Sequence, residues 1–567
     1  MRLTYSAHRH SLNWFGILTL AVVALSTFFV VYPLIIIIKR AFFGESGLDV
    51  EGIVQLITDP AVAEVILNTI SVVGVSGVFA LLVGALFAWL NERTDADAGW
   101  ISELLPLIPL LIPTIACVIG WVTLLSPQAG LLNALLRDLF SLVGINIRRG
   151  PVNIFTYTGF VFVMFLYLLP FSYLIISAAL RNLDPALEEA ARITGASPLR
   201  TFWKVTLPSI RPALAASALV LIIQGVANFS VPIVLGTGAG IDVLSVRIYQ
   251  LLYAYPPKVD LAIIMSLFMM ITAQTALILQ RWISSSGRFA TIGGKGSAAS
   301  RIRLGRWRLP VRSAMIGYLL ATSFVPVVGL LIVSLQPLWT ARIVWGRLSL
   351  SNYTHILFER QMTSDALQNS LMLGMAGATI GMLIAALIAL TVRNSPTWLQ
   401  GPIDGMTVLP AAVPHSVMGV GFLFAFGQGW LNLHGTLAIL LIVYLVMYLP
   451  QAVRSASAAS AQVGRELVEA AAISRASPLT VFRRVQLPLM MPGLVAGWVI
   501  LFVHCAGELT ASALLSASNN PVVGLVLLDL WENGSFPQVA AMSIVVTMTF
   551  TIIVLVMLRY CRGGLRR

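Results

Sequence analysis

Two polar side chains interrupt an apolar stretch near the end of this sequence, at a spacing that lets them act together. His504 and Glu508 lie within the apolar run from Gly493 to Leu515, and a separation of four residues places them on one face of a helix. Imidazole and carboxylate groups are costly inside an apolar segment, and they commonly mark a path for solutes or ions. The chemistry expected of this pair is the polar lining of a translocation path.

A second polar pair occupies the matching place in an earlier apolar segment. Gln224 and Asn228 lie 280 residues before His504 and Glu508. Two facing helices with polar groups at matched depths fit the walls of one path, but hydrogen bonds that hold helices together would use the same residues. The residues leave both roles open, although the isolation of Glu508 as an acid within a span favours a functional role for it. His415 stands alone in another span, where packing is the expected role.

The composition places these residues in a membrane protein. The chain of 567 residues is 58% hydrophobic and only 10% charged, with a mean hydropathy of +0.89, which excludes a soluble domain. Its net charge of +13 is expected to reflect membrane topology rather than nucleic-acid binding. The scattered cysteines have no disulfide or metal-ligand spacing. The first apolar run is expected to be a retained span and not a signal peptide.

Twelve apolar stretches are long enough to cross a bilayer, which needs about 20 residues per helix. The first six are Trp14 to Ile38, Ile66 to Leu90, Leu104 to Leu125, Phe155 to Leu180, Ala213 to Leu235 and Leu261 to Leu279. The last six are Ala314 to Ser334, Leu371 to Val392, Met406 to Phe426, Leu437 to Val453, Gly493 to Leu515 and Val539 to Leu558. A basic Gly/Ser-rich stretch separates the two sets. The sequence therefore predicts an all-α polytopic membrane protein, with a first unit at 1–283, a cytoplasmic linker at 284–312 and a second unit at 313–567.

One polar motif occurs once in each unit. Residues 189–213 and 469–493 match at about half of their positions with a constant spacing of 280. Each copy, within a loop at about 181–212 or 461–492, predicts a helix, a sharp turn and a second short helix. Arg475 stands where the first copy has Gly195 at the turn, and arginine tolerates the left-handed backbone poorly, so the second turn is expected to differ. A DNA-binding helix-turn-helix is disfavoured between membrane spans.

The units also match outside these loops, at a spacing of 301. The matched residues are Asn68-Thr69 with Asn369-Ser370, and Pro109, Pro113 and Gly120 with Pro410, Pro414 and Gly421. The change from 301 to 280 means that the second unit lacks roughly 20 residues, which correspond to the external stretch from Ser126 to Asn153. Lysine and arginine gather in the motif loops, the linker and the C-terminal tail, so we expect these parts and both termini to be cytoplasmic and the two units to be parallel.

Sequence signatures of catalysis are missing. Gly293-Gly294-Lys295-Gly296 lacks the upstream glycine and the Ser/Thr that a nucleotide-binding loop requires. No HExxH motif and no supported Ser/His/Asp set occurs. We therefore expect no enzyme activity in this chain, no metal or cofactor bound by it and no nucleic-acid partner.

The repeated motif resembles the EAA loop of ABC-importer permeases. The matching residues of the first copy are Glu189, Ala190, Ala191, Gly195, Phe202, Leu207 and Pro208. Those of the second are Glu469, Ala470, Ala471, Phe482, Leu487 and Pro488, with Arg475 at the glycine position. The resemblance covers nearly the whole chain as two fused permease units. It is strongest to the permeases of ferric-iron-type importers, and the segments Leu124 to Asn133 and Asp529 to Gly534 add to it.

The resemblance implies two parallel six-helix units of the type I permease fold in a bacterial inner membrane. Each loop would dock on one subunit of a cytosolic ATPase dimer, and Glu189 and Glu469 would anchor the loops, either to the ATPase or within the loop. ATP and Mg would be used by that separate chain, and a periplasmic substrate-binding protein would deliver the solute.

The substrate that the resemblance favours is ferric iron, with thiamine, aminoethylphosphonate or another small anion as alternatives. An ion-coupled secondary transporter is the competing class. Such a transporter normally carries several ionisable groups within the membrane, whereas this chain offers Glu508, His504 and His415 at most.

Overall fold

The fold is helical almost throughout. The computed structural model describes residues 14–44, 47–48, 54, 58–97, 112–286, 301–427, 431–464, 466–467, 470, 473–474 and 478–564. In the first half the helices are α1 (Trp14–Phe42), α3 (Pro60–Arg93), α6 (Thr114–Leu125), α7 (Leu131–Leu142), α8 (Tyr157–Asn182), α9 (Pro185–Ile193), α10 (Pro198–Thr201), α11 (Leu207–Ser209), α12 (Arg211–Ala227), α13 (Thr237–Ala239), α14 (Leu244–Tyr253) and α15 (Val259–Ser286). Two short strands, β1 (Phe43–Gly44) and β2 (Gly47–Leu48), pair antiparallel.

The second half is also built of helices. Its helices are α16 (Arg308–Leu319), α17 (Val325–Ser334), α18 (Ser351–Thr354), α19 (Gln361–Asn394), α20 (Thr397–Val408), α21 (His415–Phe426), α22 (Leu437–Ala461), α24 (Pro478–Val481), α25 (Leu487–Ala506), α26 (Thr510–Leu515), α27 (Val523–Glu532) and α28 (Phe536–Gly564). Single π-helical turns join α10 to α11, α16 to α17 and α24 to α25.

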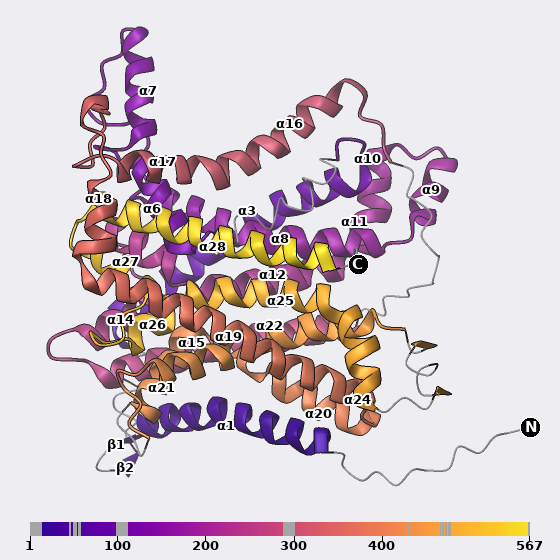
Figure 1. Ribbon diagram of the computed structural model, residues 1–567. Coiled ribbons are helices and arrows are strands. Elements are labelled where there is room, and N and C mark those ends of the chain that lie inside the picture. The colour runs from indigo at the N-terminus through magenta and orange to yellow at the C-terminus, as the bar shows by residue number, and fades with distance from the viewer. Residues whose placement is uncertain are drawn as a thin grey trace, which may run out of the picture.

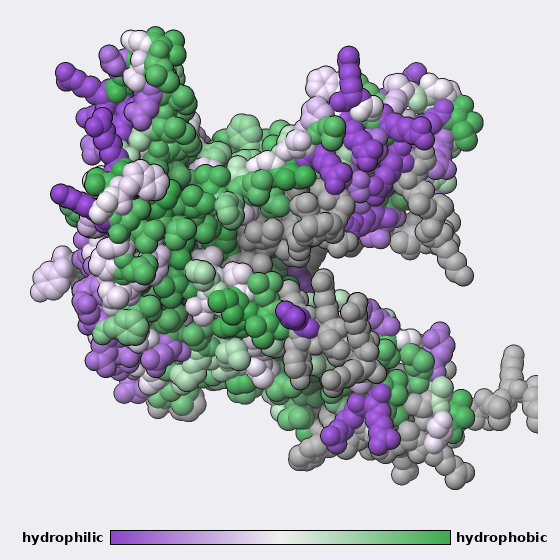
Figure 2. Space-filling view, turned by 45° about the horizontal axis from the view of Figure 1, so that its top comes forward, coloured by the Kyte–Doolittle hydropathy of each residue, from purple (hydrophilic) through white to green (hydrophobic). Residues whose placement is uncertain are grey.

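The long helices form one bundle. Among the described residues, nine helices are long and apolar enough to cross a membrane, or up to twelve if each of three bent pairs is one span. In Figure 1 these helices run side by side, and the start of α1 and the end of α28 lie at the same end of the bundle as α9 and α24. Hydrophobic residues cover the flank between the two ends, and hydrophilic residues gather towards the ends (Figure 2). The expected all-α polytopic fold is confirmed.

Three predicted spans are not single straight helices. The fifth span of each unit is interrupted, because α12 ends at Ala227 and α25 ends at Ala506, short of the predicted ends. In the second unit's third span, Trp398–Ala412 and His415–Phe426 meet at 95°. The break lies at Pro414, which lacks an N–H and disfavours helical backbone in the residue before it. The first unit's third span is described from Ile112 onward, with α6 beginning directly after Pro113, so Pro109 and the rest of that span lie outside the described residues.

The first helix of each half packs on the other half. Helix α1 lies against α21, and α17 lies against α6. Each contact places a proline next to a matched glycine, because a Cβ on Gly421 would lie 2.9 Å from Cβ of Pro33, and one on Gly120 would lie 2.7 Å from Cβ of Pro326. The matched glycines therefore allow the close approach of helices that the two halves exchange. The unit boundaries predicted from the repeat stay a prediction, and helices from the two sides of these boundaries pack on one another.

Matched hydroxyl groups fasten the short helices α14 and α27. The Thr69 hydroxyl accepts a hydrogen bond from the backbone N–H of Leu244 at 3.0 Å, and the Ser370 hydroxyl accepts one from Val523 at 2.9 Å. Both N–H groups belong to the first residue of a helix, where no intrahelical partner is present. The hydroxyl residue of each repeated pair, Thr69 or Ser370, thus serves as a long-range helix cap.

The end of the basic linker is fixed to the loop after α3. Ile302 forms a parallel bridge with Thr94, and its N–H donates to the carbonyl of Arg93 at 2.9 Å. The Leu304 N–H donates to a carboxylate oxygen of Asp95 at 2.9 Å, and Arg301 pairs with Asp97 at 2.7 Å. The acidic start of this loop is therefore a partner of the linker, of which residues 287–300 lie outside the description.

Candidate functional site

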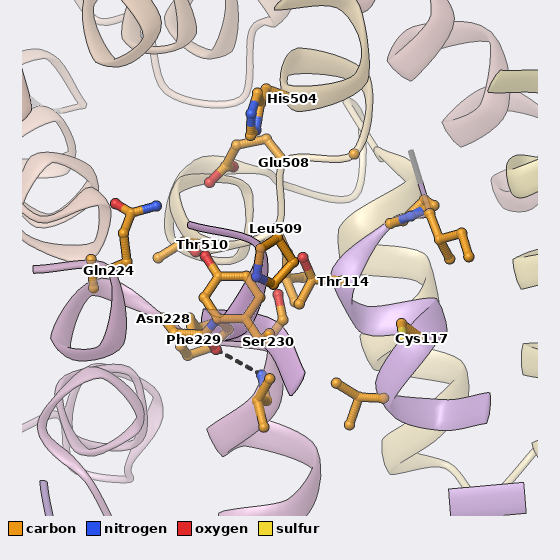
Figure 3. A pocket seen from close by; sticks show the side chains of 18 of the residues that line it. Thr114, Cys117, Gln224, Asn228, Phe229, Ser230, His504, Glu508, Leu509 and Thr510 are labelled. Carbon is orange, nitrogen blue, oxygen red and sulfur yellow. Dashed lines mark hydrogen bonds between the residues drawn. The ribbon is translucent and has the colours of Figure 1, made fainter. Parts of the chain in front are cut away.

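The predicted path residues meet at one cavity between the two halves. The cavity has a volume of about 180 Å³, and Gln224, Asn228, His504 and Glu508 all line it. Figure 3 shows His504 and Glu508 on one side, with Gln224 and Asn228 reaching the same space from the other half. The matched depths read from the repeat correspond to real proximity in the structure.

Asn228 and Glu508 also hold the interruptions of the two fifth spans. The Asn228 side-chain oxygen accepts a hydrogen bond from the N–H of Val231 at 2.9 Å. The Glu508 carboxylate accepts from the N–H groups of Ala511 and Ser512, both at 2.9 Å, and from the Ser512 hydroxyl at 2.8 Å. In each half the acceptor lies three residues before the first donor, so the two breaks are built alike. Side chains that accept local N–H groups compete with the helix ladder, which explains why the apolar runs break here.

The two roles weighed for these residues are therefore not exclusive. Glu508 is 5% exposed and lies on the cavity wall, while its oxygens satisfy backbone donors of α26. A carboxylate that accepts several N–H groups is stabilised in place and offers few free lone pairs to a solute. Its main observed action is to shape the wall.

Aromatic and imidazole rings form a second part of the wall. Tyr448 stacks on His504 with ring centroids 5.2 Å apart, and the His415 ring meets Tyr448 edge-on at 5.4 Å. His415 was expected to serve packing, and it does contact Tyr448, but it also lines the cavity. Sequence reasoning missed Tyr448 and Gln451, which flank Pro450 inside α22. Their signal was weak, since neither residue belongs to a polar pair that recurs in the other unit.

The wall of the cavity combines polar with apolar side chains. Among the described residues no group of three or more His, Cys, Asp or Glu side chains could hold a metal ion. Amides, imidazoles and phenols suit brief contacts to a solute better than tight retention of it. A transport path requires such brief contacts, because the solute must leave again.

The first motif loop has the predicted helix, turn and helix. Asp184 caps α9 by accepting from the Ala186 N–H at 2.9 Å, and Gly195 takes a left-handed conformation with φ +85°. Ser197 then accepts from the Arg200 N–H at 3.3 Å and starts α10. Glu189, Ala190 and Ala191 lie in α9, Phe202 starts the π-helical turn and Leu207-Pro208 start α11. The loop then joins α12 through a 66° bend.

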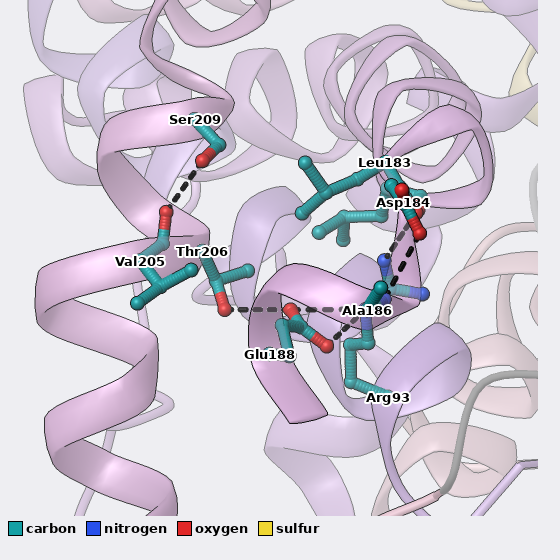
Figure 4. A network of polar contacts seen from close by, with 9 residues as sticks. Arg93, Leu183, Asp184, Ala186, Glu188, Val205, Thr206 and Ser209 are labelled. Atoms are coloured by element: carbon teal, nitrogen blue, oxygen red, sulfur yellow. Dashed lines mark hydrogen bonds and ion pairs between the residues drawn. The ribbon is translucent and has the colours of Figure 1, made fainter. Parts of the chain in front are cut away.

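The buried anchor of this loop is Glu188, one residue before the predicted Glu189. Its carboxylate pairs with the Arg93 guanidinium at 2.9 Å and accepts the Thr206 hydroxyl at 2.6 Å. Figure 4 shows Glu188 between these two partners, which come from α3 and from the second part of the loop. Both members of the ion pair are 4% exposed. Glu189 is more exposed than Glu188, because the helix turns the next position outward, so anchoring within the loop is assigned to Glu188.

Arg93 has a counterpart in the second half, Arg393. Arg93 donates to the carbonyls of Leu180 and Leu183 at 2.7 and 3.3 Å. Arg393 likewise donates to the carbonyls of Ser460 and Val463, which lie 280 residues further along. Each arginine thus caps the end of the fourth span of its unit. The second sequence has Val468 at the position of Glu188, so this acid is present in the first copy alone.

The second loop is described in part. Ala470 is helical and exposed, Phe482 starts a π-helical turn, and Leu487-Pro488 start α25. Glu469, Ala471 and Arg475 lie outside the described residues, so the expected difference at the Arg475 turn stays a prediction.

Comparison with known proteins decides the family. A model described as "Binding-protein-dependent transport system inner membrane component" matches residues 76–288 and again residues 377–562. The chain belongs to this family. It carries two copies of the family unit in one polypeptide, and it is a multi-pass inner-membrane component and the permease of an ABC importer.

Relatives of this permease include proteins that match across both units and proteins that match across one unit. It is 27% identical over 541 residues to a protein named ferric transport system permease FbpB from Actinobacillus pleuropneumoniae, covering 94% of this chain and 76% of the relative. A putative ferric transport permease of Haemophilus influenzae is 26% identical, with 89% and 78% covered. A putative 2-aminoethylphosphonate permease of Salmonella typhimurium is 28% identical over 39% of this chain and 83% of its own length. A crystal structure of a bacterial alginate ABC transporter aligns with TM-score 0.39 and 21% identity, covering 48% of this chain and 95% of that one.

Proposed function

We propose that this permease imports ferric iron, with a separate ATPase dimer as its motor and a periplasmic binding protein as its donor. The observation that carries the substrate is the similarity to ferric permeases over most of the chain. The cavity is compatible with an iron that passes through, since its wall carries several polar side chains and, among the described residues, no cluster that could hold a metal ion.

The motif loops supply the docking surface for the ATPase. Large apolar side chains stand exposed at matched positions, with Ile193 87% and Ile473 83% exposed, and Leu187 and Leu467 both 50% exposed. Exposed apolar side chains grouped on polar loops mark sites of protein association. Both loops lie at one end of the bundle (Figure 1), so a dimer could engage both at once. Basic residues gather on these loops, which supports a cytoplasmic location for this end of the bundle.

Transport then follows from rocking of the two halves. The ATPase dimer closes on ATP and draws the loops together, and the loops move the spans to which they are bonded. In the first half that connection is the Glu188–Arg93 pair, which joins α9 to the end of α3. The cavity lies between the halves, so relative motion of the halves opens it to one side or the other.

An organophosphonate is the second candidate substrate. The similarity to an aminoethylphosphonate permease favours it, as does a cavity wall with amide, hydroxyl and imidazole donors that suit an anion.

Uptake into vesicles tests the proposal. The permease is reconstituted with its ATPase and binding protein, and radioactive iron uptake is measured with and without ATP, with 2-aminoethylphosphonate as a competitor. Uptake that needs ATP and the binding protein supports the proposal. Uptake driven by an ion gradient alone would reject the ATPase, and ATP-dependent uptake of the phosphonate but not of iron would reject the substrate.

Two matched variants test the docking surface. Ile193→Asp and Ile473→Asp place a charge at the same exposed position of each loop, and each should release the ATPase during purification while leaving the permease folded. Ser141→Asp serves as the control, because it places the same charge at an exposed position at the opposite end of the bundle. Full retention of the ATPase by both isoleucine variants would count against docking on these loops.

A further inference from the structure

The first unit carries a helical hairpin that does not line the cavity and is separate from the motif loops. It consists of α7 and the return segment up to Val152, and it corresponds to the stretch that the second unit lacks. In Figure 1 it lies at the end of the bundle opposite α9 and α24, runs across the direction of the long helices and extends past α17. Helix α7 therefore runs crosswise to the long helices and extends past the flank of the bundle.

The base of this hairpin is built rigidly. Asn133 is fully buried, and its side-chain nitrogen donates to the carbonyls of Leu125, Ser126 and Val152 at 3.0, 2.9 and 2.7 Å. Its side-chain oxygen accepts from the Val152 N–H at 3.2 Å. A single amide thus ties α7 to the end of α6 and to the return segment. The hairpin is therefore fixed to the end of α6, and other residues of α6 line the cavity.

The hairpin exposes a continuous apolar face. Leu135, Leu139 and Leu142 recur at spacings of four and three, which place them on one side of α7, and Leu142 is 82% exposed. The face continues into the return segment through Val143, which is 76% exposed, and Ile145. In Figure 2 the hairpin forms the column at the upper left, with hydrophobic residues along the side that faces over the flank of the bundle. A patch of this kind in contact with water would be unfavourable, so it marks a contact.

Positive charge borders the apolar face. Arg148 and Arg149 are exposed in the return segment, whereas Arg137 and Asp138 are neighbours of opposite charge within α7. An apolar helix face bordered by arginines is the arrangement of helices that lie in a membrane interface, with the apolar side among acyl chains and the cations at lipid phosphates. The place of the hairpin agrees with this, since the space under its overhang is the space that lipid fills around the spans.

We propose that α7 lies in the membrane surface at the end of the bundle opposite the motif loops, with Leu135, Leu139 and Leu142 among acyl chains and Arg148 and Arg149 at lipid phosphates. The orientation proposed above makes this the outer leaflet, although the contact itself does not depend on transport. The hairpin serves as a one-sided support that holds the first unit at a fixed depth, with Asn133 as its rigid joint to α6.

Spin labels on the two sides of α7 test this inference. The full-length permease, with Cys117, Cys505 and Cys561 replaced by alanine, is given a single cysteine by Leu139→Cys or by Ser141→Cys and is reconstituted into vesicles of phosphatidylethanolamine and phosphatidylglycerol. Collision rates with oxygen, which concentrates in lipid, and with a water-soluble nickel chelate are measured for each label. The cysteine-free parent, treated in parallel, shows that no label enters elsewhere.

The inference expects opposite orders at the two positions. The label at position 139 should collide more with oxygen, and the matched label at position 141 should collide more with the nickel chelate. Free access of nickel to both labels would mean that the hairpin stands in water, and protection of both labels from both reagents would mean that a protein covers it. Either result would overturn the inference.

The arginines have a separate test in the same vesicles. Replacing phosphatidylglycerol by neutral phosphatidylcholine should lower the oxygen preference of the label at position 139, and Arg148→Gln with Arg149→Gln should abolish that lipid dependence. An oxygen preference that is equal in both lipids with the native arginines would overturn their assignment to lipid phosphates.

Discussion

The Arg93–Glu188 pair is expected to determine how firmly the first motif loop is held to the bundle. Both side chains are 4% exposed, and their closest N–O distance is 2.9 Å. Glu188→Gln removes the negative charge while keeping the size and one acceptor oxygen, and it leaves the Arg93 guanidinium buried without its counter-ion. Breaking a buried pair on one side costs roughly 3–5 kcal/mol. The hydrogen bonds of Arg93 to the carbonyls of Leu180 and Leu183 remain, so we take the lower limit of about 3 kcal/mol.

The cost should appear as local opening of the loop. A change of about 3 kcal/mol corresponds to roughly a hundredfold change in an equilibrium constant. Amide hydrogen exchange in α9 should therefore be about a hundredfold faster in Glu188→Gln, while exchange in α8 changes little. Mass spectrometry of peptides that cover residues 185–206 measures this, and ATP-driven uptake should fall because the loop no longer moves the end of α3.

The second half supplies the matched control. Arg393→Gln removes an arginine that binds the same two carbonyl positions, but the sequence there has Val468 in place of the acid. Comparison with Arg93→Gln therefore isolates the ion pair from the carbonyl bonds, and combining Arg93→Gln with Glu188→Gln should restore part of the lost protection. An α9 exchange rate that changes less than about threefold in Glu188→Gln would refute the reasoning, since the loop would then be held by other contacts.

Three further changes have expected outcomes. Glu508→Ala removes the acceptor for two N–H groups of α26, which costs about 1–2 kcal/mol. Because Glu508 also shapes the cavity wall, uptake should fall more than the amount of folded protein measured by size-exclusion chromatography. A proportional loss would indicate a purely structural role. Gly421→Ala would place a Cβ 2.9 Å from Pro33, whereas a Cβ on Gly401 would meet open space. The melting temperature should therefore fall by an amount equivalent to about 1–3 kcal/mol for Gly421→Ala and hardly at all for Gly401→Ala. Equal shifts would contradict close packing of α1 on α21. Burial, and then the charge of Asp529, raises the pKa of Glu532, which ends α27 outside the candidate spans. A raised folded-state pKa means a contribution that is present at low pH and lost as pH rises through that pKa. Glu532→Gln should therefore gain stability relative to the native chain as pH rises from the ordinary glutamate pKa of about 4 through the raised pKa of Glu532. A melting-temperature difference that does not grow with pH would contradict this.

Most of the architecture could be predicted from local sequence. Apolar length predicted the long spans because a helix in lipid must satisfy its own backbone, and α1, α3, α8 and α28 follow the predictions within several residues. The first motif loop was also predictable, since Asp184, Gly195 and Ser197 act through their own neighbours in the chain. The buried ion pair within the loop belongs to Glu188 and not to the motif residue Glu189, because burial depends on where Arg93 and Thr206 lie; contact of Glu189 with the ATPase stays a prediction.

The candidate path was predictable as a set of residues, but its construction was not. The matched spacing predicted that Gln224, Asn228, His504 and Glu508 lie near one another, and all four line one cavity. The helix breaks at Asn228 and Glu508 escaped prediction because apolar content continues through them. Whether a side chain accepts from the N–H groups ahead of it depends on backbone geometry that hydropathy does not record.

The sequence by itself determined that this chain is a doubled membrane bundle with two matched polar loops, because apolar length, charge placement and a constant repeat spacing are properties of the chain alone. The tertiary structure decided which acid anchors the first loop, that the first helices are exchanged between the halves, and that Asn228 and Glu508 shape the wall of a shared cavity. Those outcomes depend on contacts between residues far apart in the chain, such as Arg93 with Glu188 and Pro33 with Gly421. A pairing of this kind is fixed only when the spans pack, since no local preference of either residue specifies its partner.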